Sequence, residues 1–407
     1  MVTKNGTPGP DTLTGSPDAD TLTARGGDDL LQPLSGADFA YGGTGNDTIA
    51  FTDLTGGQAF GGTGLDTLDL TLIAGPSLFL DFRDGSASQS GTVPGTIGFT
   101  GMDRLTLTSL ADGDTVFGSS GNDSVTYGGR GGEVHGRGGD DLIAYIPNVA
   151  ATLDGGAGND TLQVDAGTTV LYFIVDTFDG SIDDGELSVI TGFETYDATG
   201  GGFADIAAFD QGNDVFFGLN GDDTAFGGLG NDSLDGGRKA DSLLGGAGND
   251  ILTGDGQNDA LFGGEGDDRL TGGRGKDVLD AGAGRDRIRL YLGNDTVTGG
   301  EGDDKFVFYG IDSGLHSITD FVSGSDHLLF NAALLPLGPA AGPLDPALLS
   351  LGAASGSQAQ FVLRYNAGED RSVLLWDPDG DNPSGGTTAL AQFTGQITLT
   401  ADDILIL

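Results

Sequence analysis

Two short stretches, GGAGNDILT at residues 245–253 and GGEGDDRLT at residues 263–271, contain the pattern that organises this chain. They share the nonapeptide G-G-x-G-x-D-x-U-x, in which U is an apolar residue. An aspartate recurs at the sixth position every nine residues from Asp205 to Asp304, twelve times without a break. Core packing does not require a carboxylate at that interval. The repeat therefore predicts a stacked architecture that binds cations.

The eighth position of the unit tests this phase. From Ala207 to Phe306 it holds only apolar residues, so each nonapeptide contributes one core side chain. Glycines at the first, second and fourth positions are expected to let a short loop adopt positive φ, and the last three positions suit a very short strand. Two units make one coil of eighteen residues. Loops eighteen residues apart should then stack on the same edge.

Charge decides when such a stack can form. Same-edge aspartates would lie one strand spacing, ~4.8 Å, apart, and two such charges repel by about 3 kcal/mol at an effective dielectric near 20. One buried Leu contributes about 1.5–3 kcal/mol, whereas ordering nine residues costs about 13 kcal/mol. Without a cation the repeats should be disordered. Calcium is the predicted ion, because the ligands on offer are carboxylate and carbonyl oxygens, and the chain has no Cys and only three scattered His residues.

These residues resemble the RTX (repeats in toxin) family of calcium-binding nonapeptide, or hemolysin-type, repeats. The resemblance implies an all-β fold, a right-handed parallel β-roll (β-solenoid), with a C-terminal β-rich cap and secretion region. It also implies that the first six residues of each unit bind Ca²⁺ between successive turns, with the sixth-position Asp supplying carboxylate oxygens. Lys239 and Gln257 replace the fourth-position glycine. Their loops are expected to bind calcium weakly or to lack an ion.

The predicted calcium ligands are the sixth-position aspartates of the regular units, with on the order of ten or more ions in all. They are Asp20, Asp29, Asp38, Asp47, Asp66, Asp123, Asp141, Asp160, Asp214, Asp223, Asp232, Asp241, Asp250, Asp259, Asp268, Asp277, Asp286, Asp295 and Asp304. The sequence DPDGD at residues 377–381 is a further candidate calcium loop. A polar surface turn explains that segment equally well.

The organisation along the chain follows the repeats and two interruptions. The predicted segments are an N-terminal repeat block (1–69), a strand-rich insert (70–111), a second repeat block (112–163), a second strand-rich insert (164–202), the main repeat block (203–307) and a cap with a type I secretion region (308–407). The inserts look like copies, because GMDRL at 101–105 matches GFETY at 192–196 at an offset of 91 residues. We expect them to continue the solenoid as longer, calcium-free strands. The alternative is that they form small lobes.

The C-terminal segment has its own local signals. Residues 306–308 and 317–330 resemble the sequence that caps the roll in this family, and Asp345 with Pro346 predicts the start of a short helix. Residues 372–376 and 397–399 are predicted to be strands. His135, His316 and His327 are expected to be surface or cap residues.

Composition limits the classes of function. A formal charge of −44, from 61 acidic and 17 basic side chains, argues against nucleic acid and anionic membranes as direct partners. No run of eighteen apolar residues predicts a membrane span, and the N-terminus lacks a Sec-type signal peptide, so export would use another signal. The chain has no H-E-x-x-H and no G-x-S-x-G motif. The sequence therefore does not support a zinc protease or an α/β-hydrolase, and we nominate no catalytic residue.

The sequence therefore predicts a secreted, extracellular calcium-binding protein. It would be exported by type I secretion machinery and folded by Ca²⁺ outside the cell. Its predicted role is structural, in a matrix, or in interaction with a cell surface or extracellular polysaccharide. One alternative is an extracellular polysaccharide-modifying enzyme of the lyase or epimerase type, with its site on an insert face. Another is a module that binds acidic polymer through shared calcium.

Overall fold

The structure is a computed structural model that describes residues 2–34, 36–51, 57–71, 78–81, 86–89, 96–100, 103–109, 115–127, 132–145, 152–165, 174–176, 181–183, 187–191, 195–199, 204–209, 211–310, 314–335, 339, 341–352, 358–379 and 387–407. Within these ranges the regular elements are β-strands and three 3-10 helices, with no α-helix. None of the helices in this described part is long and apolar enough to cross a membrane.

The chain divides into two compact units, here called unit 1 (residues 1–167 and 171–198) and unit 2 (residues 168–170 and 199–407). In each unit the strands alternate along the chain between two sheets, here called sheet A and sheet B. Strands of one sheet pair in parallel, and each coil adds one strand to each sheet. The fold is the predicted parallel β-roll.

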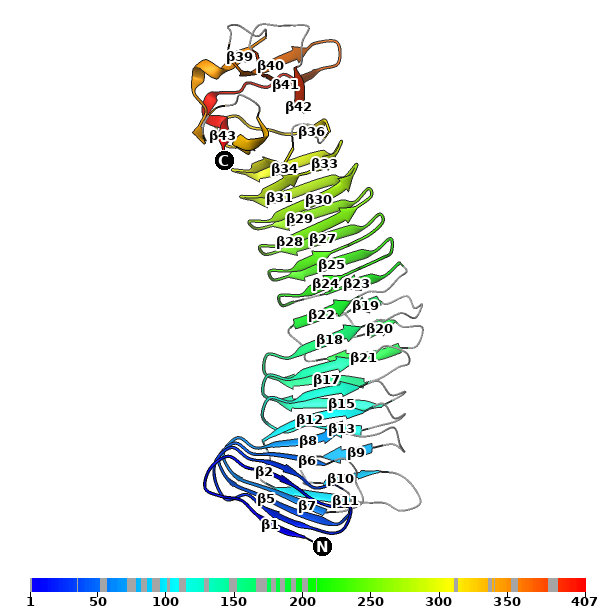
Figure 1. Ribbon diagram of the computed structural model, residues 1–407. Helices are drawn as coiled ribbons and strands as arrows, with labels where there is room; N and C mark the ends of the chain where they lie inside the picture. The colour runs from blue at the N-terminus through cyan, green and yellow to red at the C-terminus, as the bar shows by residue number, and fades with distance from the viewer. Residues whose placement is uncertain are drawn as a thin grey trace. The chain divides into compact units, whose positions relative to one another are not determined.

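Unit 2 contains the most regular part of the roll, whose strands form successive rungs in Figure 1. Its sheet A strands are β23 (Ile206–Ala208), β25 (Thr224–Leu229), β27 (Ser242–Ala247), β29 (Ala260–Glu265), β31 (Val278–Gly284) and β34 (Thr296–Gly302). Its sheet B strands are β24 (Val215–Phe217), β26 (Ser233–Asp235), β28 (Ile251–Gly256), β30 (Arg269–Gly275), β32 (Arg287–Leu290), β33 (Leu292–Gly293) and β35 (Lys305–Phe308). Parallel pairing joins residues eighteen apart, such as Leu243 with Leu261 and Leu252 with Leu270. The predicted coil of eighteen residues is confirmed.

The core of this roll is the column of eighth-position residues. All of them from Ala207 to Phe306 are at most 1% exposed. Second- and fourth-position glycines adopt positive φ, for example 116° at Gly246 and 140° at Gly248. The first-position glycine does not, so the expectation that it supplies positive φ is wrong. It is needed for space instead, because a Cβ atom on Gly245 would lie 2.3 Å from Asp250 Oδ2.

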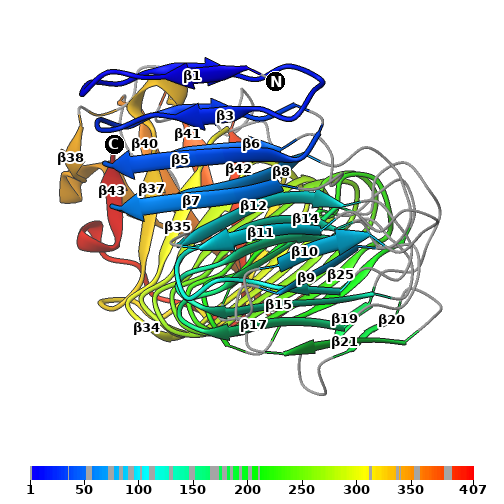
Figure 2. The ribbon, with the colours of Figure 1, turned by 90° about the horizontal axis from the view of Figure 1, so that it is seen from below.

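Unit 1 repeats this architecture with fewer regular loops. Its sheet A strands outside the inserts are β1 (Thr3–Asn5), β3 (Thr21–Thr23), β5 (Asp38–Thr44), β7 (Gly57–Thr63), β13 (Thr115–Phe117), β15 (Glu133–Gly138) and β17 (Thr152–Ala157). Its sheet B strands are β2 (Thr12–Thr14), β4 (Leu30–Gln32), β6 (Thr48–Phe51), β8 (Thr67–Thr71), β12 (Arg104–Ser109), β14 (Ser124–Tyr127), β16 (Leu142–Tyr145), β18 (Thr161–Asp165) and β22 (Thr195–Thr199). Figure 2 shows β1, β3, β5 and β7 side by side.

The two inserts share one topology. The first contains β9 (Leu78–Asp81), β10 (Ser86–Gln89) and β11 (Thr96–Thr100), and the second contains β19 (Ile174–Asp176), β20 (Ser181–Asp183) and β21 (Leu187–Thr191). Each trio is antiparallel, and its last strand pairs in parallel with the roll, β11 with β7 and β21 with β17. The strands β11 and β21 are 91 residues apart. The described insert strands therefore extend sheet A, and β10 and β20 run antiparallel to the strands on either side of them.

The C-terminal segment of unit 2 closes the roll. Its elements are β36 (His316–Ile318), β37 (His327–Phe330), η1 (Ala332–Leu334), β38 (Gly342–Pro343), η2 (Pro346–Leu348), β39 (Leu349–Leu351), β40 (Gln360–Asn366), β41 (Arg371–Asp377), β42 (Thr388–Thr394), η3 (Ala401–Asp403) and β43 (Ile404–Ile406). The strands β36 and β37 continue sheets A and B, and β42 and β43 pair in parallel on top of them. The strands β40, β41 and β42 form an antiparallel sheet. Aromatic side chains fill this end, including Phe308 stacked on Phe330 at 4.5 Å and Trp376 against Phe361 at 4.9 Å.

Two local predictions in this segment have different outcomes. Asp345 caps η2, and its side chain accepts a hydrogen bond from the Ala347 N–H, so the predicted helix start is confirmed. The predicted strand at residues 397–399 is wrong, because no strand lies between β42 and β43. The Ile397 N–H donates to the side-chain hydroxyl of Ser372 in β41 at 3.2 Å and not to a backbone carbonyl of a strand.

Candidate calcium-binding loops

The predicted ligands are buried, although they are carboxylates. Each of the nineteen sixth-position aspartates proposed from the sequence is at most 4% exposed, and Asp205, at the start of the unbroken run, is 1% exposed. Lys, Glu, Arg and Asp are rarely buried this fully unless they are paired. The loops therefore place many negative charges inside the two edges of the roll.

Hydrogen bonds arrange these side chains into ladders. The Oδ1 atom of Asp250 accepts the backbone N–H of Asp232 at 2.8 Å, and the Oδ1 atom of Asp268 accepts the N–H of Asp250 at 2.8 Å. One edge of unit 2 contains the ladder Asp214, Asp232, Asp250, Asp268, Asp286 and Asp304, and the other contains Asp205, Asp223, Asp241, Asp259, Asp277 and Asp295. In unit 1 the ladders join Asp20 with Asp38, Asp29 with Asp47 and Asp66, and Asp123 with Asp141 and Asp160.

The second carboxylate oxygen of most of these residues has no hydrogen-bond partner among the described residues. The Oδ2 atoms concerned belong to Asp29, Asp47, Asp66, Asp141, Asp223, Asp232, Asp241, Asp250, Asp259, Asp268, Asp277, Asp286 and Asp304. Leaving a buried acceptor unsatisfied costs about 1–3 kcal/mol, and more when it is charged. The ladders thus satisfy one oxygen of each carboxylate and leave the other directed into the loop.

The space beside Oδ2 is lined by oxygen. A Cβ atom on Gly263 would lie 2.4 Å from Asp268 Oδ2 and 2.4 Å from the carbonyl oxygen of Ala281 in the next coil. A carboxylate oxygen and a backbone carbonyl oxygen therefore approach the same point, which only glycine leaves open. Hard oxygen ligands in a flexible loop suit Ca²⁺. Within the described ranges, no three His, Cys, Asp or Glu side chains gather as a metal site.

Burial and neighbouring charges change the acidity of the ladders. The pKa of Asp223, Asp259 and Asp268 is raised to about 7. Loss of hydration is the largest cause, and the negative charges of neighbouring aspartates add to it. Burial likewise raises the pKa of Asp232 and Asp277 to about 6. Without a cation these carboxyl groups hold protons at a pH where ordinary aspartates are ionised.

A second ladder, at the fifth position, was not predicted. The side chain of Asn231 accepts the backbone N–H of Asn249 at 2.7 Å, and that of Asn249 accepts the N–H of Asp267 at 2.7 Å. Its polarity is opposite to that of the sixth-position ladder, because here the residue eighteen positions later donates. The signal was present in the sequence as frequent Asn and Asp at the fifth position. These residues are exposed, so they bond the loops to one another at the surface of the edge.

Two aspartates outside the repeat phase also join the ladders. Asp103, in the first insert, accepts the N–H of Asp66 at 3.1 Å, and Asp326, in the cap, accepts the N–H of Asp304 at 3.1 Å. Asp103 lies 37 residues after Asp66, and Asp326 lies 22 residues after Asp304, so neither spacing fits the nine-residue period. The only sequence signal at Asp326 is the Gly-Ser-Asp at 324–326 before the apolar strand β37.

The loops with Lys239 and Gln257 keep the backbone of the regular units. Both residues have φ of 85° at the position normally held by glycine. Asp241 and Asp259 in the same loops remain in the ladder, with the Asp241 N–H donating to Asp259 Oδ1 at 2.9 Å. The substituted loops are therefore strained and not rearranged.

The three histidines and the DPDGD loop at residues 377–381 do not belong to the aspartate ladders. His135 is half-buried in unit 1 and its Nδ1 lies 3.3 Å from Asp154 Oδ2, whereas His316 is fully buried in β36 with its Nδ1 2.9 Å from Asp295 Oδ2. His327 lies in β37, within the cap. In the DPDGD loop, Asp377 is buried and Asp379 donates its N–H to Asp377 at 3.3 Å, while Asp381 lies outside the described residues.

Comparison with known families agrees with this geometry. A sequence profile of the RTX calcium-binding nonapeptide repeat matches residues 5–40, 33–50, 106–132, 152–171, 199–234, 210–243, 235–270, 253–288 and 271–306. The chain therefore belongs to the RTX proteins, and its repeats are calcium-binding repeats. No curated protein matches the chain.

Two solved structures are among those that the chain matches. A subunit of the mannuronan C5-epimerase from Azotobacter vinelandii is 24% identical, with a TM-score of 0.27, over 37% of this chain and 79% of that chain. The extracellular lipase LipA from Serratia marcescens is 16% identical, with a TM-score of 0.19, over 74% of this chain and 42% of that chain. At these TM-scores neither likeness bears on the activity of this chain.

Proposed function

We propose that this protein is a secreted RTX protein whose roll folds when calcium fills its loops outside the cell, and whose folded surface serves a structural, matrix or surface-interaction role. The observation that carries the proposal is the set of thirteen buried Oδ2 atoms that have no hydrogen-bond partner within the part of the chain that the structure describes. The nineteen sixth-position aspartates are the proposed ligands, together with backbone carbonyl oxygens of the same loops.

The energetic argument is simple. Each unsatisfied buried oxygen costs about 1–3 kcal/mol, so the thirteen such atoms in the several ladders together cost as much as, or more than, the ~5–15 kcal/mol by which an ordinary domain is stable. Calcium neutralises the carboxylates, and its binding free energy becomes folding free energy. Extracellular modules bind calcium with dissociation constants of about 10⁻⁴–10⁻³ M. At a lower intracellular calcium level the chain would stay unfolded and ready for export.

Export through type I secretion machinery completes the proposal. Its support is the family resemblance of residues 308–407, which form the β-rich end of unit 2. Because the chain would fold only at extracellular calcium levels, it would still be unfolded while it is exported. The location we propose is extracellular.

Calcium titration tests this proposal. The chelated protein at pH 7.5 should give the far-ultraviolet circular dichroism of a disordered chain, and millimolar calcium should restore the β signal, whereas magnesium at the same concentration should not. Atomic absorption on the dialysed protein should count on the order of ten or more calcium ions per chain. An unchanged β signal in chelator would contradict calcium-driven folding.

A further inference from the structure

A histidine follows in register after the last aspartate of the ladder that runs from Asp205 to Asp295. His316 begins β36, which pairs in parallel with β34. This pairing sets Ser317 opposite Thr296, so His316 falls opposite Asp295, one coil further on. Every earlier rung of this ladder carries an aspartate at the corresponding place. A histidine therefore stands where the repeat calls for the next aspartate.

The imidazole of His316 meets the carboxylate oxygen that the regular loops leave open. His316 Nδ1 lies 2.9 Å from Asp295 Oδ2, and both side chains are buried, at 0% and 2% exposed. One coil earlier, Asp277 Oδ2 has no hydrogen-bond partner among the described residues. The ladder itself is regular here, because the Asp277 N–H donates to Asp295 Oδ1 at 3.0 Å. The loops of Asp277 and Asp295 thus differ at Oδ2.

The first position of the Asp295 loop is changed as well. In the preceding loop on this edge it is Gly272, where a Cβ atom would lie 2.4 Å from Asp277 Oδ2. Leu290 occupies this position in the loop of Asp295, and its side chain is fully buried. A side chain does not fit into the space beside Oδ2 that the regular loops keep open with glycine. The loop of Asp295 therefore cannot repeat their cation-binding geometry.

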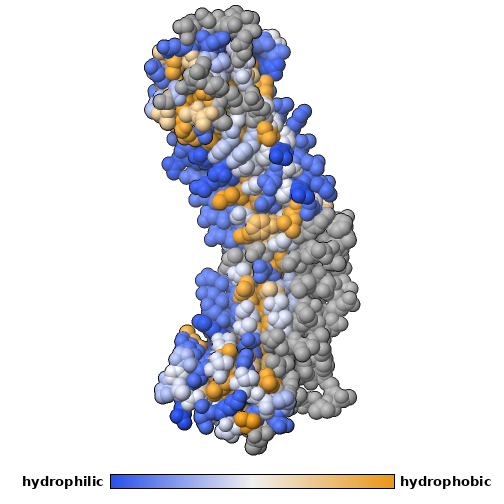
Figure 3. Space-filling view, in the orientation of Figure 1, coloured by the Kyte–Doolittle hydropathy of each residue, from blue (hydrophilic) through white to orange (hydrophobic). Residues whose placement is uncertain are grey.

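Apolar side chains continue from Leu290 into the cap. Leu290 pairs with Phe308, and Phe308 with Phe330, on successive strands of sheet B, and all three are at most 2% exposed. The rings of Phe308 and His316 lie 6.0 Å apart, edge to face. By contrast, the visible face of unit 2 in Figure 3 is largely hydrophilic, with apolar side chains gathered in a few places. A column of glycines thus becomes a buried apolar column next to His316.

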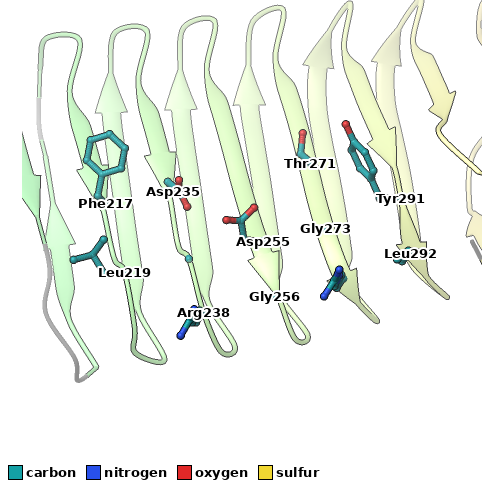
Figure 4. Close-up of a pocket in the computed structure, with 12 residues that line it drawn as sticks. Phe217, Leu219, Asp235, Arg238, Asp255, Gly256, Thr271, Gly273, Tyr291 and Leu292 are labelled. Carbon is teal, nitrogen blue, oxygen red and sulfur yellow. The ribbon is translucent and has the colours of Figure 1, made fainter.

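The second position shows the same change nearer the surface. Figure 4 shows second-position residues of this edge, Leu219, Asp255, Gly273 and Tyr291, along a groove of about 770 Å³ that follows sheet B of unit 2. The ring of Tyr291 stacks on that of Tyr309 in the next coil, with the ring centres 4.5 Å apart. Ring stacking needs no cation. It joins the loop of Asp295 to the coil that follows.

The other edge of unit 2 keeps the calcium-binding pattern up to the cap. Its last repeat aspartate, Asp304, donates its N–H to Asp326 Oδ1 at 3.1 Å, so an aspartate holds the next place. A Cβ atom on Gly299 would lie 2.6 Å from Asp304 Oδ2. This Oδ2 atom has no hydrogen-bond partner among the described residues. The two edges therefore end differently.

We propose that His316 takes the place of a calcium ion at the loop of Asp295, so that the column of ions on this edge ends at the loop of Asp277. The inference rests on the proposed function and reassigns Asp295, one of the nineteen proposed ligands, to a side-chain partner. An imidazole N–H is a donor that can balance a buried carboxylate oxygen without a metal. Leu290 removes the space for the ion, and His316 supplies the partner. The roll is thus joined to its cap on this edge without calcium.

Native mass spectrometry of the full chain in saturating calcium tests this assignment, because it counts the ions bound to each chain. Asp295→Asn should bind as many calcium ions as the natural sequence, since its amide oxygen keeps the ladder hydrogen bond. The matched variant Asp277→Asn, one coil earlier in the same ladder, should lose one ion. Equal numbers in the two variants would overturn the proposal, because the two loops would then not differ. A natural chain that binds no calcium would instead refute the proposed function.

A second variant restores the repeat. Leu290→Gly combined with His316→Asp returns the first-position glycine and the ladder aspartate, so this chain should bind one more calcium ion than the natural sequence. The control His316→Gln removes the imidazole without adding a carboxylate, and it should gain no ion. The melting temperature in calcium shows whether each variant is folded. A folded double variant without an additional ion would overturn the proposal, and if the double variant does not fold, the comparison of Asp295→Asn with Asp277→Asn decides.

Discussion

Replacing Asp268 by Asn should change the stability of the roll in opposite directions with and without calcium. The Asn side-chain oxygen can still accept the N–H of Asp250, which donates to Asp268 Oδ1 at 2.8 Å. The negative charge and the unpartnered Oδ2 atom are removed. The ladder geometry is therefore kept, and only the electrostatic contribution of one rung is altered.

The structure sets the magnitude of both effects. Burial, and then the charges of Asp250 and Asp286, raise the pKa of Asp268 from 3.8 to about 7. At about 1.4 kcal/mol per tenfold change, an ionised Asp268 would cost the metal-free roll about 4 kcal/mol, which screening by solvent at the edge reduces to about 2 kcal/mol. In calcium the negative charge of Asp268 stabilises the roll, because it pairs with the bound cation. Removing one partner of a buried ion pair costs about 3–5 kcal/mol, so the calcium-loaded variant should lose about that much.

Two denaturation series check this prediction. Urea unfolding in saturating calcium at pH 7.5 should give a lower midpoint for Asp268→Asn than for the natural sequence. In chelator, folding induced by the osmolyte TMAO should need less osmolyte for the variant. Asp267→Asn is the matched control, because Asp267 is an exposed fifth-position residue and Asn249 already fills the same role in the neighbouring loop. A loss of stability in both series would show that Asp268 acts through packing and would refute the electrostatic argument.

Two further predictions concern protons and strain. In chelator, the β signal should grow as pH falls from 8 to 4. The reason is that the folded roll raises the pKa of buried groups such as Asp223 and Asp259 to about 7. The stability that their protonation contributes is complete below about pH 4 and is lost as pH rises through 7. In calcium the trend should reverse, because protons compete for the same oxygens, and a circular dichroism titration that shows the same trend in both conditions would contradict this. Gln257→Gly should raise the stability of the calcium-loaded roll by about 1 kcal/mol, because Gln257 has φ of 85°, and a lower melting temperature would show that its side chain makes a contact worth more than the strain.

Much of the fold could be predicted because the repeat makes every level of structure periodic. The nine-residue repeat predicts an apolar residue at the eighth position of each nonapeptide, one strand for each nonapeptide and a coil of eighteen residues. The pairing of Leu243 with Leu261 agrees with this coil length. Prediction was poorer where the period ends. The antiparallel strands β10 and β20 and the strand wrongly placed at residues 397–399 lie in segments whose pairing depends on distant partners.

The sequence by itself determined the roll, its calcium-binding repeats and which carboxylates would be stacked, because each of these depends on spacing alone. Only the tertiary structure decided what each carboxylate oxygen does. In regular loops such as that of Asp250 it assigned Oδ1 to a backbone N–H eighteen residues away and left Oδ2 without a hydrogen-bond partner among the described residues, because stacking brings the backbone of one coil against the side chain of the next. It also brought Leu219, Asp255 and Tyr291 to one groove, since residues eighteen apart become neighbours only once the chain is coiled.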